Sequence, residues 1–272
     1  FRLGEGCRTG RGDAVIVARI EWAVLLKGAR WHPVFSGAAR VQETLVVDPF
    51  QGDQQARGGH HIPREDGTAI LLIGINAMAG QVLITLGGLP TGTVLDFRTV
   101  PPDVIASGLD ARDYMGRALA VGDITGDGQA DLIMGSPDAD GPGNVAPDSG
   151  EIHVIGGPLG RGTRVDQVVR ASDIVLHAPT AAAQLGRSLS LARDARGDAH
   201  LLASAPRSIA CTSGGVAYQV DGLAGMSGAV DIDTLAAATA FGGEGVTLLG
   251  LVVVLAEVSG DVDLDPVRGY WS

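Results

Sequence analysis

The stretch "GDITGDGQADLIMG", Gly122 to Gly135, places acidic residues at near-alternating positions between glycines, with an apolar run directly after. Calcium in proteins prefers oxygen ligands, six to eight of them, and carboxylates are the commonest source. Counted from Asp123, position 12 is Met134, where an EF-hand loop requires a bidentate glutamate. The stretch therefore predicts a calcium loop that is not an EF-hand. The alternative interpretation is an acidic β-turn whose aspartates are solvated.

Two later segments repeat this one. Residues 249–269 align with 115–135 without a gap, and residues 185–204 align with one deletion. The leading glycines Gly116, Gly186 and Gly250 are 70 and 64 residues apart. Repeats at such a period are typical of arrays and propellers.

A second element recurs between these segments. It is a glycine followed by an alternating apolar stretch and a turn, as in "GQVLITLGG" from Gly80, "GEIHVIGG" from Gly150 and "GGVAYQVDG" from Gly214. Alternation of apolar and polar residues is the signal of a half-buried strand. The repeating unit is thus two strands joined by an acidic loop, a variable loop, an alternating strand and a turn. This order predicts an all-β fold of antiparallel units.

Composition supports a folded chain that carries excess negative charge. Hydrophobic residues make up 45% of the 272 residues, there are 41 glycines, and the net charge is −11. The charge argues against nucleic acid or an anionic membrane as the main partner. The most apolar run, Val246 to Ala256, has 11 residues, about half of a membrane-spanning helix, and predicts a buried strand. Cys7 and Cys211 could form a disulfide or stay reduced.

The repeat resembles the FG-GAP repeat of integrin α-chain β-propellers and their bacterial relatives. The paired positions that give that repeat its name stand here as Met115-Gly116, Leu185-Gly186 and Leu249-Gly250, then Gly135-Ser136-Pro137 and Ser204-Ala205-Pro206, with Gly74-Ile75-Asn76 as a weaker copy. The resemblance covers residues 66–272 and is most specific over 115–157. It implies a β-propeller-like array of about four units. Residues 1–65 match poorly and are expected to be β-structure that packs on or completes the array.

The resemblance also implies a ligand set for each acidic loop. In the first loop the ligands would be the side chains of Asp123, Thr125, Asp127 and Asp131 and the carbonyl of Gln129. In the last loop they would be Glu257, Ser259, Asp261 and Asp265 with the carbonyl of Asp263. Thr125 departs from the family pattern, where Asp or Asn is usual, and this should weaken calcium binding. In the last loop Val262 replaces a glycine, and a β-branched residue resists positive φ.

The middle copy has lost the oxygen pattern. Ala192, Asp194, Arg196 and His200 align with the ligand positions, so we expect no metal there. The guanidinium of Arg196 could replace the cation with its own charge.

The resemblance implies a calcium-binding extracellular or periplasmic interaction or adhesion scaffold, with no catalytic residues. One alternative is an accessory domain of a secreted hydrolase, and another is a structural subunit of a larger surface or membrane-attached assembly. Partners are expected at variable loops such as Asp138 to Gly150. The last unit ends at Gly269 without its alternating strand, so we expect Asp13–Trp22 or another chain to complete it.

Overall fold

The computed structural model describes the backbone of residues 7–9, 46–47, 56–63, 69–75, 79–86, 94–95, 100–166, 172–209, 214–242, 252–256 and 265–269. Side chains are described in 79–86, 100–166, 172–209 and 214–242 and at Val253. Regular structure in these residues is β-strand, apart from one 3-10 turn, η1 (Ile232–Thr234). The all-β prediction is confirmed.

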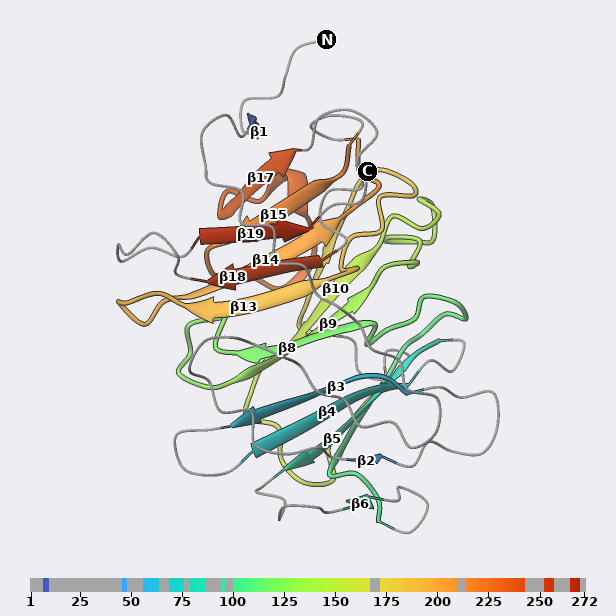
Figure 1. Cartoon of the computed structure of the whole chain (residues 1–272). Helices are drawn as coiled ribbons and strands as arrows, with labels where there is room; N and C mark the ends of the chain where they lie inside the picture. The colour runs from blue at the N-terminus through green and yellow to red at the C-terminus, as the bar shows by residue number, and fades with distance from the viewer. Residues whose placement is uncertain are drawn as a thin grey trace.

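Three five-stranded sheets share one plan (Figure 1). The first contains β3 (Ala56–Pro63), β4 (Ala69–Ile75), β5 (Gln81–Leu86), β7 (Val104–Ser107) and β11 (Arg164–Asp166). The second contains β8 (Ala118–Gly122), β9 (Asp131–Ser136), β10 (Glu151–Ile155), β12 (Ile174–His177) and β16 (Gly228–Asp231). The third contains β13 (Leu189–Arg193), β14 (Ala199–Ala205), β15 (Val216–Val220), β17 (Ala238–Gly242) and β1 (Cys7–Thr9).

In each of the three five-stranded sheets, the first four strands pair antiparallel with their neighbours, and the fifth strand pairs parallel to the fourth. The fifth strand of the first two sheets comes from the following unit. β11 precedes β12 in the chain yet pairs with β7, and β16 precedes β17 yet pairs with β12. On the third sheet β1 takes the same place, with Cys7 opposite Ala240.

Two smaller sheets complete the described strands. β18 (Val252–Ala256) pairs with β19 (Asp265–Gly269), and β2 (Val46–Val47) pairs with β6 (Val94–Leu95). β18 lies within the predicted apolar strand 246–256, and its Val253 packs with Leu202 and Ala217 of the third sheet. Residues 13–22 lie outside the described residues, so the expectation that they complete the last unit stays a prediction.

The core lies between the sheets, which stack in the order first, second, third (Figure 1). One apolar cluster joins the first and second sheets through residues such as Ile84, Val104 and Met134. A larger one joins the second and third through residues such as Ile152, Leu201 and Tyr218. Successive strand residues point to opposite faces, so the second sheet contributes to both clusters.

Backbone contacts at the repeat's name-giving positions hold each unit together and join it to the next. The N–H of Gly116 donates to the carbonyl of Gly135 at 3.0 Å, and in the next unit Gly186 donates to Ser204 at 2.9 Å. Between units, Gly150 has a φ of +86°, and a Cβ there would lie 2.2 Å from the backbone N of Leu185. Only glycine fits this junction.

The resemblance to the repeat was placed at residues 66–272. The strand β3 lies before this boundary and β4 lies after it, yet the two strands pair in one sheet. Residues 56–63 therefore share a sheet with the repeats.

Candidate functional site

The acidic hairpin connects β8 to β9, where the ladder closes at the pair Gly122 and Asp131. Gly126 and Gly128 have φ values of +74° and +83°, and a Cβ at either would meet no atom within 4 Å. Their requirement for glycine is thus conformational rather than steric.

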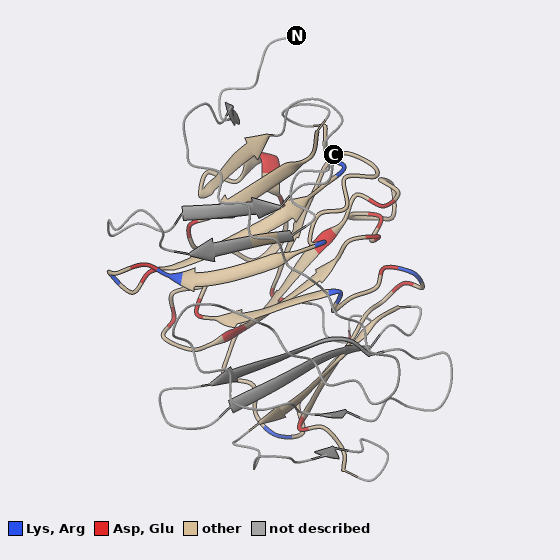
Figure 2. Ribbon diagram, in the orientation of Figure 1, with Lys and Arg blue, Asp and Glu red and all other residues tan. Residues whose placement is uncertain are grey.

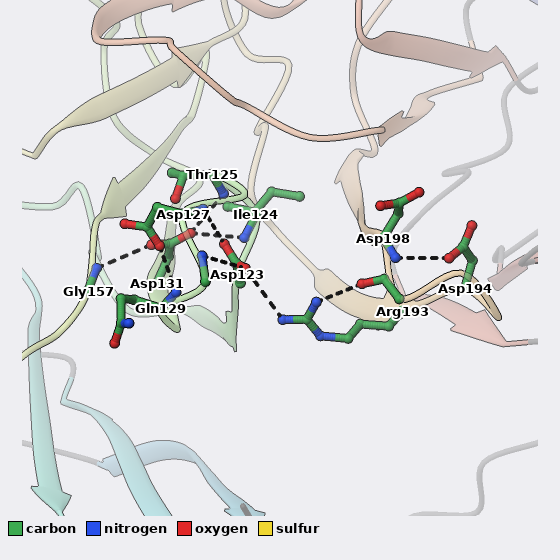
Figure 3. Close-up of polar contacts among 12 residues, drawn as sticks. Asp123, Ile124, Thr125, Asp127, Gln129, Asp131, Gly157, Arg193, Asp194 and Asp198 are labelled. Carbon is green, nitrogen blue, oxygen red and sulfur yellow. Dashed lines mark hydrogen bonds and ion pairs between the residues drawn. The ribbon is translucent and has the colours of Figure 1, made fainter.

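Asp131 anchors the hairpin from beneath (Figure 3). Its side chain is buried, with 1% of the residue exposed. One carboxylate oxygen accepts the backbone N–H groups of Ile124 and Thr125, both at 2.9 Å, and the other accepts that of Gly157 at 3.2 Å. A buried carboxylate is tolerated when several N–H groups satisfy it.

Asp123 and Asp127 bind the tip of the same hairpin. The two oxygens of Asp123 accept the N–H groups of Asp127 and Gly128, each at 3.0 Å. Asp127 accepts the N–H of Gln129 at 2.7 Å. All three aspartates therefore hold the loop through backbone amides, and Figure 3 shows them around its interior.

Thr125 carries the hairpin's unsatisfied polar atom. Its Oγ1 is buried and has no hydrogen-bond partner. Among the residues with described side chains, no three Asp, Glu, His or Cys side chains gather as a metal-binding group. The donor set of the hairpin nevertheless consists of oxygen atoms, the ligand type that calcium prefers, and one of them, the Thr125 hydroxyl, has no partner in the protein.

The equivalent hairpin of the third sheet is built differently. The ladder pairs Ala192 with His200 as it pairs Gly122 with Asp131, so Arg193 stands at the place of Asp123. The sequence alignment, which put Ala192 there, is wrong by one residue because the deletion lies inside the loop.

Asp194 holds this second hairpin by accepting the N–H groups of Arg196 and Asp198, both at 2.9 Å. Burial raises the pKa of Asp194, but these bonds and the contact with His200 outweigh it and hold the pKa below its usual value. The guanidinium that binds the loop carbonyl belongs to Arg193, which donates to Gly197 at 2.7 Å. The suggestion from the sequence that Arg196 could replace the cation with its own charge stays a prediction.

The last predicted loop cannot be placed. Glu257, Ser259, Asp261 and Asp263 lie outside the described residues, and Asp265 is described only as the first backbone position of β19. Its ligand set stays a prediction.

An acidic cluster lies at the other end of the second sheet, on the β7–β8 and β9–β10 connections. It consists of Asp110, Asp113, Asp138, Asp140 and Glu151. Burial, together with the charges of the other four carboxylates of the cluster, raises the pKa of Asp113 to about 7. Burial raises the pKa of Glu151 to about 7 as well, with help from Asp110 and Asp140. In Figure 2 these acidic loops and the hairpin after β13 lie on opposite sides of the stack.

His153 lies beside this cluster, with Nε2 3.3 Å from Glu151 Oε2. Burial lowers the pKa of His153 to about 4. Near neutral pH the contact therefore joins a neutral imidazole to the carboxyl group and is not an ion pair. The buried Nδ1 of His153 has no hydrogen-bond partner.

Sequence reasoning missed two backbone groups that fix the acidic hairpin. Gly157 N–H binds Asp131, and Leu223 N–H of the third sheet's connection donates to the Ile124 carbonyl at 2.8 Å. The double glycine after the alternating strand, which recurs at 87–88 and 156–157, could have indicated the first. No signal in the sequence indicates the second, because it joins residues about 100 positions apart.

Residues 115–155, which contain the hairpin, β8 to β10 and the loop between β9 and β10, match the family model of the FG-GAP repeat. This segment is an FG-GAP repeat. FG-GAP domains are generally interaction modules, often in extracellular proteins, and are typically non-catalytic. No curated protein matches the chain. In the described residues no helix is long and apolar enough to cross a membrane.

Proposed function

We propose that the chain is a β-propeller-like interaction module, extracellular or periplasmic, whose FG-GAP hairpin at residues 123–131 is ordered by calcium. The observation that carries the calcium part is the buried, unpartnered Thr125 Oγ1 inside a hairpin whose other inward groups are carboxylates. Millimolar calcium outside the cytoplasm suits a weak structural site.

The residues that would hold the ion are Asp123, Thr125, Asp127 and Asp131 by their side chains and Gln129 by its carbonyl. Each carboxylate already accepts backbone N–H groups, but an ionised carboxylate has about four lone-pair sites and can take a cation as well. The ion would neutralise three negative charges that now lie within one short loop. Residues 257–265 are a second candidate site, supported by the sequence alone.

The propeller arrangement is supported by the shared plan of the sheets. Each has the same four-stranded antiparallel order, and each first strand lies toward the next sheet's first strand, since β8 contacts both β3 and β13, and β13 contacts β18. Successive inner strands around an axis are the arrangement of propeller blades. β18 and β19 would then begin a fourth blade.

The proposed partner surface is the end that carries the acidic cluster. Three large apolar side chains are exposed on its connections: Leu109 at 55%, Val145 at 80% and Ile209 at 64%. Val145 lies in the β9–β10 loop and Ile209 in the equivalent β14–β15 loop. Exposed apolar residues beside charged loops are a feature of protein interaction sites.

The calcium test is a thermal melt with calcium and with a chelator. Binding to the folded state alone should raise Tm with calcium, by an amount that grows with calcium concentration. Asp127→Ala should remove or reduce the shift, while Asp198→Asn, an exposed acid in the neighbouring hairpin, should not. A wild-type Tm that is the same in calcium and chelator would refute the calcium proposal.

The interaction test compares wild type with a Val145→Ser, Ile209→Ser double variant. Proteins captured by the wild type should be lost from the variant, while Tm and the calcium shift stay unchanged because both side chains face solvent. Ala195→Ser, in the hairpin at the opposite end, is the matched control. If the wild type, the double variant and Ala195→Ser all capture the same proteins equally, the partner surface lies elsewhere.

Two alternatives lead to different results. An accessory domain of a secreted hydrolase would bind the enzyme's polymeric substrate in place of a protein. A subunit of a surface assembly would be recovered in a large complex by size-exclusion chromatography of native extract.

A further inference from the structure

Arg193 of the third sheet contacts two acidic hairpins at once (Figure 3). Its Nη1 donates to the Gly197 carbonyl of its own hairpin at 2.7 Å. Its Nη2 lies 3.9 Å from Oδ2 of Asp123, in the FG-GAP hairpin of the second sheet. One guanidinium thus connects the hairpins of adjacent units.

The position of Arg193 in its unit is that of Asp123 in the preceding one, as the strand register shows. Where the second sheet has the first acid of the loop, the third has a fixed positive charge. That charge is directed both to its own loop carbonyl and to the acid of its neighbour.

The FG-GAP hairpin is also bonded to the connection that follows β15 of the third sheet. Leu223 N–H donates to the Ile124 carbonyl at 2.8 Å, and both residues are buried, at 0% and 2% exposure. The backbone of the FG-GAP hairpin is therefore anchored on the third sheet. The Asp123 side chain is 13% exposed and that of Arg193 is 50% exposed, so only the guanidinium has room to move away.

We propose that Arg193 sets the cation affinity of the neighbouring FG-GAP hairpin by competing for Asp123, an inference that rests on the calcium function proposed above. A calcium ion at Asp123 would place two positive charges beside the guanidinium. Like charges a few ångströms apart repel, and the repulsion is moderated but not removed by solvent and salt. Binding and the ion pair must oppose each other equally, because coupling between two equilibria is reciprocal.

The test is calorimetric titration of calcium into chelator-stripped wild type, Arg193→Gln, Arg193→Lys and Arg196→Gln, at about 20 mM and about 300 mM KCl, two screening regimes. At low salt Arg193→Gln should bind calcium about twofold to tenfold more tightly than wild type. Arg193→Lys keeps the charge and should stay near wild type. At high salt the gain should shrink.

Arg196→Gln is the matched control, because it removes the same charge from the same hairpin. Its affinity should equal that of the wild type. Melting curves in chelator check that each variant is folded. An Arg193→Gln affinity that equals the wild type, falls below it or is matched by Arg196→Gln would overturn the proposal.

The titration separates this inference from the calcium function itself. Calcium binding by wild type that Arg193→Gln leaves unchanged overturns the role of Arg193 alone. Binding by Arg193→Gln but not by wild type supports it in its strongest form. If neither the wild type nor Arg193→Gln binds calcium, the role of Arg193 and the calcium site are overturned together.

Discussion

Gly157 donates its backbone N–H to the buried carboxylate of Asp131 across the gap between two connections of the second sheet. The same carboxylate holds Ile124 and Thr125, so one side chain fixes the FG-GAP hairpin to the turn that follows β10. The hairpin therefore has a protein anchor that does not depend on any metal.

Asp131→Asn should destabilise the protein even in chelator. The amide replaces one acceptor oxygen with an N–H₂ donor that faces backbone donors, and hydrogen bonds to a charged group are worth about 1.5–3 kcal/mol each. Chemical denaturation in chelator would measure the loss, with Asp198→Asn as the exposed control. An unchanged free energy of unfolding would contradict the anchoring role.

Asp113→Asn should stabilise the protein at pH 8 and have little effect near pH 4. Because the folded pKa of about 7 lies above the ordinary value of 3.8 for an aspartate, the protein loses stability as pH rises between those values. Asn cannot ionise and removes that loss, on the order of 1 kcal/mol once solvent screening is allowed for. Melting temperatures at pH 4, 6 and 8 would show the gain growing with pH. A gain that is equal at all three would point to a cause other than ionisation.

Gly150→Ala should destabilise the protein by about 3 kcal/mol or more, since a positive φ and a steric clash both oppose the new Cβ. Gly162 has a nearly identical φ of +85° with no atom within 4 Å of a built Cβ. Gly162→Ala should therefore cost only about 1 kcal/mol, the conformational part alone. Equal losses in urea denaturation would show that the contact with Leu185 is not limiting.

Tyr218→Phe should destabilise the protein more at pH 8 than at pH 4. The buried hydroxyl donates to Asp233 Oδ1 at 2.5 Å. Burial raises the pKa of Asp233, and this hydrogen bond lowers it by favouring the ionised form. Without the donor the ionised carboxylate loses its partner, at a cost of about 1–2 kcal/mol. A loss that is larger at pH 4 would reverse the assignment.

Much of the local structure could be predicted from the sequence because it depends on local patterns. The alternating runs after Gly80, Gly150 and Gly214 became β5, β10 and β15, and the spacing from Asp123 to Asp131 became a hairpin with two left-handed glycines. Alternation and glycine placement act over a few residues, so they can be recognised without knowledge of the fold.

The contacts that complete the site could not be predicted, because they join distant parts of the chain. Leu223 reaches Ile124, and Arg193 reaches Asp123, only after two sheets have stacked. The acids Asp113 and Glu151 are unremarkable in the sequence, and burial between connections gives them their raised pKa values. The alignment that placed Ala192 opposite Asp123 was wrong by one residue for a related reason. Only the pairing of the strands shows where in the shortened loop the deletion lies.

Because the fifth strand of a sheet comes from the following repeat, the boundaries of the sequence repeat differ from the boundaries of the hydrogen-bonded sheet. Each repeat carries, ahead of its own last strand, the segment that adds a fifth strand to the sheet of the repeat before it, as β11 joins β7 and β16 joins β12. Deleting a repeat at its own sequence boundaries would therefore leave the preceding sheet one strand short, with its fourth strand at the edge. A clean excision needs boundaries that are shifted into the neighbouring repeat.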